Sequence, residues 1–322
     1  MMGSFDVSRV IKIMEVFLLT KVRNKMLLVL VIVVFAAMNS ASLFAATSAA
    51  MSDENFIRLS AIGNLRLIND AIKNGANVNA RNEDGWTPLM YAVWFSKPEV
   101  LTALIEAGAE VNAQNDDGVT PLMFAAQFNS NPEVITTLIK AGADVNAQDG
   151  DGRTPLMRAA SLNSNPEIIT TLIKAGADFN AKGIHDSTPL MEAASGNSNP
   201  AVIATLIEAG LDVNARNIGG VTPLMMAASN NSNPEVIATL IKAGAEVNVL
   251  SNKTNNRWTQ ATTPLMGAAC FNSNPEVVTI FLEHGADPKA KCSLGKMAID
   301  YAKENGKIRN TSVFRKLNDV SF

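Results

Sequence analysis

A short block of apolar residues recurs along the chain at nearly constant intervals. The block reads Thr-Pro-Leu-Met, and successive copies lie 33, 34, 34, 34 and 41 residues apart. The threonine predicts a helix N-cap and the proline predicts the first helical position, where no backbone N–H is needed. The chain therefore contains at least six copies of one structural unit, which begin at Thr87, Thr120, Thr154, Thr188, Thr222 and Thr263.

A second helix is predicted in every unit, about ten residues after the first one begins. In the second unit, Asn131 caps a helix whose first residue is Pro132, and apolar residues follow at helical spacing. An Ala-Gly pair then ends the helix, because glycine readily takes the left-handed conformation that a helix stop requires. An Asp-Val-Asn sequence then predicts an extended arm, and an Asp-Gly turn folds it back toward the next unit, so each unit is predicted to hold two helices and an extended arm.

Pattern, order and period together strongly resemble the ankyrin repeat, over about residues 52–322. The resemblance implies an all-α solenoid of stacked helix pairs with β-hairpin fingers. We expect an N-terminal cap at 52–80, six full repeats at 81–290 and a C-terminal cap at 291–322. The fourth position of the family's Thr-Pro-Leu-His signature is Met throughout, so we expect apolar packing where the histidine would form hydrogen bonds.

Residues 1–50 differ from the rest and are typical of a signal peptide. Residues 26–38 are apolar, basic residues precede them, and small residues follow them. We expect cleavage near residues 46–51, which makes the protein exported, either periplasmic or secreted, and of bacterial type. The alternative is an uncleaved membrane anchor over residues 26–46, which places the repeats outside the cytoplasm. Translation starting at Met26 is a further reading of this segment.

Charge and composition exclude several functions. The net charge is −3, and removal of residues 1–50, which carry five basic and two acidic groups, lowers it to −6. We therefore expect no nucleic-acid partner, no membrane contact after cleavage, and a monomer. The sequence contains two histidines and two cysteines, and it has no phosphate-binding glycine loop, nucleophile elbow or metal-ligand spacing. We expect a non-catalytic protein without cofactor or metal.

The resemblance implies a protein partner of unknown identity on the concave face, which is built from the fingers and the inner helices. Large aromatic residues cluster there in the first two full repeats, and aromatic residues are common interface anchors. The alternative is that they serve packing, with Trp94 and Phe95 covering a shortened turn. The predicted contact residues are Glu83, Asp84, Trp86, Trp94, Phe95, Asp116, Asp117, Val119, Phe128, Arg153, Arg257 and Trp258.

Two of these residues, Arg257 and Trp258, lie in an insertion at residues 250–262 that lengthens one finger. The insertion is either a functional loop or a tolerated surface extension. The cysteines, Cys270 and Cys292, are expected to sit at different levels of the last repeats, too far apart for a disulfide. We expect Cys270 to be largely packed and Cys292 to be more accessible.

Overall fold

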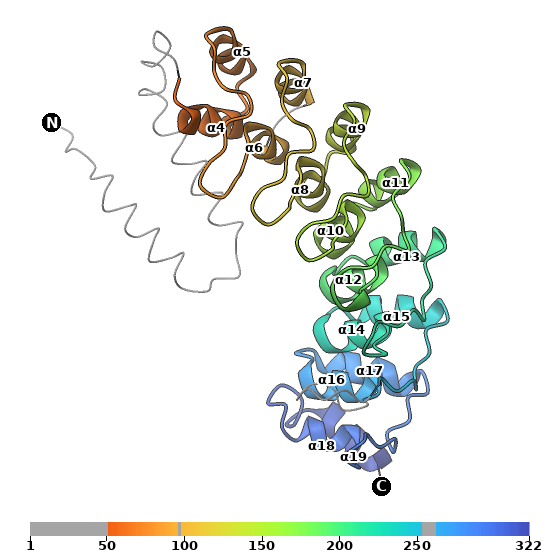
Figure 1. Ribbon diagram of the computed structural model, residues 1–322. Coiled ribbons are helices and arrows are strands. Elements are labelled where there is room, and N and C mark those ends of the chain that lie inside the picture. The colour runs from red at the N-terminus through yellow and green to blue at the C-terminus, as the bar shows by residue number, and fades with distance from the viewer. Residues whose placement is uncertain (1–50, 96–97, 253–261, 322) are drawn as a thin grey trace, which may run out of the picture.

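The computed structural model describes residues 51–95, 98–252 and 262–321, without the side chains of Trp94 and Phe95. These residues form a curved array of helix pairs, with the first and last pairs at opposite ends of the arc (Figure 1). The inner row contains α4 (Asp53–Ile62), α6 (Pro88–Phe95), α8 (Pro121–Phe128), α10 (Pro155–Leu162), α12 (Pro189–Gly196), α14 (Pro223–Asn230), α16 (Pro264–Phe271) and α18 (Ala298–Ala302). The outer row contains α5 (Leu65–Lys73), α7 (Pro98–Glu106), α9 (Pro132–Lys140), α11 (Pro166–Lys174), α13 (Pro200–Glu208), α15 (Pro234–Lys242), α17 (Pro275–Glu283) and α19 (Ser312–Ser321).

The helix boundaries follow from the capping residues that the sequence predicts. In α8 the Thr120 hydroxyl accepts a hydrogen bond from the backbone N–H of Met123, at 3.3 Å. In α9 the Asn131 side chain accepts one from the backbone N–H of Glu133, at 3.0 Å. Both helices have proline in the first turn, so one of the N–H groups that a helix start leaves unbonded is absent.

Packing between repeats runs along each row: inner helices contact inner helices and outer helices contact outer helices. The methionines of the Thr-Pro-Leu-Met blocks are almost fully buried, which confirms apolar packing at this position (Met90, Met123, Met157, Met191, Met225 and Met266). Alanines follow them in the inner helices, and their small side chains let neighbouring helices approach closely. One continuous core therefore runs from the first pair to the last.

The fingers are tight loops, and no strand is assigned within the residues that the structure describes. We number the first five: finger 1 is 82–86, finger 2 is 115–119, finger 3 is 149–153, finger 4 is 183–187 and finger 5 is 217–221. The last finger is 292–296. In finger 2 the Asn115 side chain accepts hydrogen bonds from the backbone N–H groups of Asp117 and Val119. This turn leaves each finger too short for a strand pair, so the expected β-hairpin is reduced to a hydrogen-bonded turn.

Backbone hydrogen bonds join neighbouring fingers into a row. The N–H of the second residue of one finger donates to the carbonyl of the third residue of the preceding finger. The four bonds are Asp116 to Asp84, Gly150 to Asp117, Ile184 to Asp151 and Ile218 to His185. The tips of fingers 1 to 5 thus form one continuous edge of the molecule.

A ladder of asparagines links the turns between inner and outer helices. The Nδ2 of Asn163 donates to the backbone carbonyls of Ala126 and Asn129 in the preceding repeat, both at 2.9 Å. Equivalent asparagines repeat both bonds to the end of the array, and Asn129 begins it with a bond to Val93. We call this set the asparagine ladder: Asn129, Asn163, Asn197, Asn231, Asn272 and Asn305.

Candidate partner-binding face

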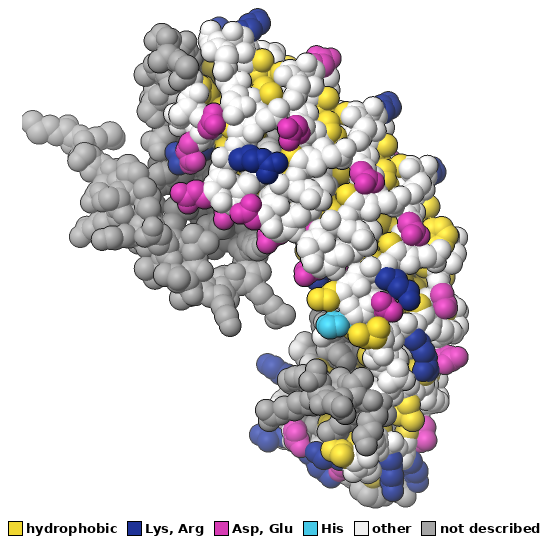
Figure 2. Space-filling model, in the orientation of Figure 1, with side chains coloured by type: hydrophobic (Ala, Val, Ile, Leu, Met, Phe, Trp, Pro, Cys, Tyr) yellow, Lys and Arg dark blue, Asp and Glu magenta, His cyan; other side chains and the backbone are white. Residues whose placement is uncertain are grey.

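The concave face is formed by the fingers and by the residues of the inner helices that point toward them. Figure 2 shows acidic side chains over the fingers near α6, α8 and α10, followed by apolar side chains and a histidine beside α12. The face therefore changes its chemistry from one end to the other. Three groups of residues define it: the acidic fingertips, an aromatic cluster and a buried ion pair.

The acidic fingertips belong to the first three fingers. The structure places Glu83 and Asp84 on finger 1 and Asp116 and Asp117 on finger 2, all exposed, as the sequence predicts for contact residues. Asp151 on finger 3 is also exposed. Within the described residues, none of these five carboxylates forms an ion pair with Lys, Arg or His.

The aromatic cluster joins the first two repeats and is built by packing. The ring of Trp86 meets Phe124 edge to face, with ring centroids 4.8 Å apart, and it also contacts Tyr91 at 5.8 Å. Phe124 in turn contacts Phe128 at 5.0 Å. Trp86 and Phe128 are half-buried against the core. Their contacts favour the packing interpretation over that of free-standing interface anchors.

Val119 is a correction to the predicted contact set. Its side chain is only 5% exposed, because it packs into the core with the inner helices while the Asn115 side chain holds its backbone N–H. It cannot serve as an exposed contact. Four of the predicted residues have no outcome here, since the side chains of Trp94 and Phe95, and all of Arg257 and Trp258, lie outside the described residues.

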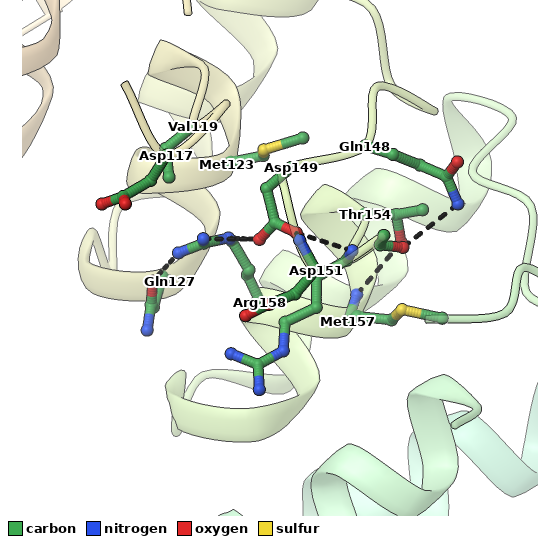
Figure 3. Close-up of polar contacts among 12 residues, drawn as sticks. Asp117, Val119, Met123, Gln127, Gln148, Asp149, Asp151, Thr154, Met157 and Arg158 are labelled. Atoms are coloured by element: carbon green, nitrogen blue, oxygen red, sulfur yellow. Dashed lines mark hydrogen bonds and ion pairs between the residues drawn. The ribbon is translucent and has the colours of Figure 1, made fainter. Parts of the chain in front are cut away.

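A buried ion pair lies beneath finger 3, where Figure 3 shows Arg158 between Asp149 and Gln127. Both the Nε and the Nη2 of Arg158 bond to Oδ2 of Asp149, the Nε at 2.9 Å. Its Nη1 bonds to Gln127 of the preceding repeat at 2.8 Å. The Asp149 side chain is 1% exposed, and its Oδ1 also accepts the backbone N–H groups of Asp151 and Arg153. Arg153 is half-buried in the same finger, and its Nε has no hydrogen-bond partner within the described residues.

Sequence reasoning missed this ion pair because it compared the tips of fingers and the ends of inner helices. The signal was present at a different spacing. In fingers 1 and 3 the first residue contacts the inner-helix residue nine positions later: Asn82 contacts Tyr91, and Asp149 contacts Arg158. Burial raises the pKa of Tyr91, and the nearby carboxylates of Glu54 and Asp84 raise it further.

The same spacing explains the cysteines and corrects their expected burial. Cys292 is the first residue of the last finger and contacts the Tyr301 hydroxyl nine positions later, at 3.3 Å. It is buried, whereas Cys270 is half-buried, so the expected order of accessibility is wrong. Cys292 takes the place that Asn115 holds in finger 2, and its Sγ accepts the backbone N–H of Leu294. The two cysteines are not joined in a disulfide, as expected.

Neither a candidate metal site nor a membrane-spanning helix is found among the described residues. No cluster of three or more His, Cys, Asp or Glu side chains there is arranged to hold a metal ion. No helix in the described ranges is both long and apolar enough to cross a membrane. The concave face combines exposed carboxylates, exposed apolar groups and internally paired polar groups, an arrangement suited to contacts with another molecule.

Family models of ankyrin repeats match most of the chain. A model of three ankyrin repeat copies matches residues 95–183, 165–251 and 224–317, and a model of many copies matches residues 58–105. The chain belongs to the ankyrin repeat family. Ankyrin repeats are generally non-catalytic scaffolds for protein–protein interaction. A search of curated proteins found no match to this sequence.

Proposed function

We propose that this ankyrin repeat protein is a non-catalytic scaffold, exported from the cytoplasm, that binds a protein partner on its concave face. The observation that carries the proposal is the continuous edge of fingers 1 to 5, whose tips hold five carboxylates without an ion-pair partner in the described residues. The fold does not require carboxylates at the fingertips. They support an interaction surface on a rigid frame.

The proposed export rests on residues 1–50, where a basic segment, a short apolar run and small residues follow one another. The second candidate is a membrane-tethered array, favoured by the apolar and small residues that continue from residue 26 to residue 46. N-terminal sequencing of the exported protein separates the two. A start near residues 46–51 supports cleavage, and an intact leader supports the anchor.

The binding face is tested by capture from the native envelope or growth medium with the mature protein. Asn230→Trp places a bulky side chain at the exposed end of α14, on the concave side, and Glu208→Trp places the same ring on the outer helix α13. We expect Asn230→Trp to abolish capture and Glu208→Trp to preserve it. Equal capture by both variants rejects the concave face.

A second capture experiment addresses the aromatic residues. If Trp86 and Trp94 anchor the partner, replacing both with alanine weakens capture by about 2 kcal/mol or more. Because Trp86 packs against Phe124, the variant is compared at a temperature where its circular dichroism matches that of the unmodified protein. Undiminished capture under those conditions assigns the tryptophans to packing alone.

A further inference from the structure

Fingers 4 and 5 expose two isoleucines where the preceding fingers carry polar residues or glycine. Ile184 is 48% exposed and Ile218 is 61% exposed. The equivalent positions of fingers 1 to 3 hold Glu83, Asp116 and Gly150, so the fold does not require an apolar side chain at this position. Large apolar side chains on adjacent tips therefore call for an explanation outside the fold.

The apolar area extends from the tips toward the inner helices. Val221 of finger 5 and Met226 of α14 are both half-buried. They occupy the repeat positions of Trp86 and Tyr91, whose rings contact each other in the first full repeat. Methionine adapts its shape to a partner more readily than branched side chains do. We call Ile184, Ile218, Val221 and Met226 the apolar step.

The apolar step is directly continuous with the acidic fingertips. The backbone N–H of Ile184 donates to the carbonyl of Asp151 at 2.9 Å, and that of Ile218 donates to His185 at 3.3 Å. A segment lying along the finger edge therefore passes from the carboxylates of fingers 1 to 3 to the isoleucines of fingers 4 and 5 without leaving the surface (Figure 2).

We propose that this edge docks a peptide segment of the partner that carries Lys or Arg over fingers 1 to 3 and aliphatic or aromatic residues over the apolar step. The proposal deepens and rests on the proposed function, since it names the chemistry of the partner on the same face. The exposed carboxylates of fingers 1 to 3 favour a positively charged segment over them. Burial of the exposed isoleucines favours apolar residues over the apolar step.

The same charges disfavour other occupants. A second copy of this chain brings its own acidic fingertips against these carboxylates, and like charges across an interface are unfavourable. Phosphate-bearing surfaces, both lipid and nucleic acid, are repelled for the same reason. A cationic segment with an apolar end is the occupant that satisfies both halves of the edge.

The proposal is tested with a displayed library of random peptides selected on residues 51–322 at low ionic strength. We expect the selected peptides to be enriched in Lys and Arg at one end and in apolar residues at the other. Selected peptides are then synthesised and titrated by fluorescence anisotropy. Selection of acidic peptides, of peptides without a basic excess, or of none at all overturns the proposal.

Two variants locate the binding of the synthetic peptides. Asp116→Asn/Asp117→Asn removes two charges with little change in shape, and it should weaken binding by about three- to tenfold. Ile184→Thr/Ile218→Thr keeps the branching at Cβ but replaces each ethyl group with a hydroxyl, and it should weaken binding of the apolar end to a similar degree. Raising the salt concentration should weaken binding to the unmodified protein more than binding to the Asn variant, which keeps three of the five fingertip carboxylates.

Matched controls change the same chemistry elsewhere. Glu106→Gln/Glu208→Gln removes two exposed charges from outer helices, and Val320→Thr changes an exposed apolar residue in α19. Both should leave peptide binding unchanged. Equal effects of fingertip and control variants overturn the proposal, because net charge alone then explains binding. If Asn230→Trp blocks capture of the native partner but the fingertip variants do not, the proposed function stands and this inference fails.

Discussion

The side-chain amide of Asn163 donates a hydrogen bond to the backbone carbonyl of Asn129, one repeat earlier, with 2.9 Å between Nδ2 and O. Its second hydrogen bond reaches Ala126 O, and its Oδ1 accepts the backbone N–H of Asn165. One buried side chain thus satisfies two carbonyls of the preceding repeat and holds the turn that leads to Asn165, the N-cap of the outer helix in its own repeat. Buried carbonyls left without a donor are costly, so this residue couples neighbouring repeats.

Replacing Asn163 with alanine should destabilise the protein by roughly 2–4 kcal/mol, because two buried carbonyls lose their donor. Urea unfolding followed by circular dichroism measures the loss. The control is Ser164→Ala, whose side chain is exposed in the same turn. Similar unfolding midpoints for the two variants would contradict a coupling role for the asparagine ladder.

The ion pair under finger 3 gives a second prediction. Arg158→Met leaves the buried Asp149 carboxylate without its cation and should cost about 3 kcal/mol. Adding Asp149→Asn should recover most of that loss, since the double variant reproduces the Asn217–Met226 combination of the fifth repeat, where Asn217 holds the same turn. A double-mutant cycle measures the coupling, and additive losses would show that the pair is not coupled.

The packing of Trp86 is tested by stability rather than by binding. Trp86→Ala removes the edge-to-face contact with Phe124 and should lower the free energy of unfolding by about 2–3 kcal/mol. Trp86→Phe keeps a ring in that place and should cost clearly less. If thermal unfolding of the alanine variant matches that of the unmodified protein, the tryptophan has no packing role.

The two cysteines should differ in the pH at which they react. Burial raises the pKa of Cys270, and Glu304 raises it further. Burial also raises the pKa of Cys292, but hydrogen bonds from the Tyr301 hydroxyl and the backbone N–H of Leu294, with the Lys296 charge, outweigh it and leave that pKa below its usual value. Since the thiolate is the reactive form, the midpoint of alkylation for Cys292 should lie at lower pH.

Alkylation rates at each cysteine are followed by mass spectrometry across a pH series. The maximal rate at Cys292 should be the smaller one, since its side chain is buried. Tyr301→Phe should raise the Cys292 midpoint by removing a donor to Sγ. A Cys292 midpoint at or above that of Cys270 in the unmodified protein would contradict the prediction.

Much of the fold could be read from the sequence because each repeat carries its own local signals. Thr120 and Asn131 mark helix starts through bonds within a few residues of themselves, and such bonds depend little on the rest of the array. The site was less predictable because it depends on contacts between repeats. Trp86 is half-buried because Phe124 of the next repeat lies against it, and an alignment of single repeats does not contain that contact.

Other differences between the predicted and the observed exposure arose because different residues occupy the same position of the repeat. Cys292 is buried because it occupies the turn position that Asn115 holds in finger 2. Val119 and Trp86 share the position before the capping threonine, yet their side chains differ in size, so the smaller one is covered. The position in the repeat fixes the backbone, and the neighbouring side chains fix the exposure.

The asparagine ladder also bears on how the length of this array changes over generations. From Asn163 to Asn231 each rung makes the same two bonds at the same chain separations, 34 and 37 residues. Loss or duplication of one whole unit in this stretch rejoins a donor to an equivalent pair of acceptors, so no buried carbonyl is orphaned. Unequal recombination within the gene can therefore shorten or lengthen the middle of the array while keeping every junction intact.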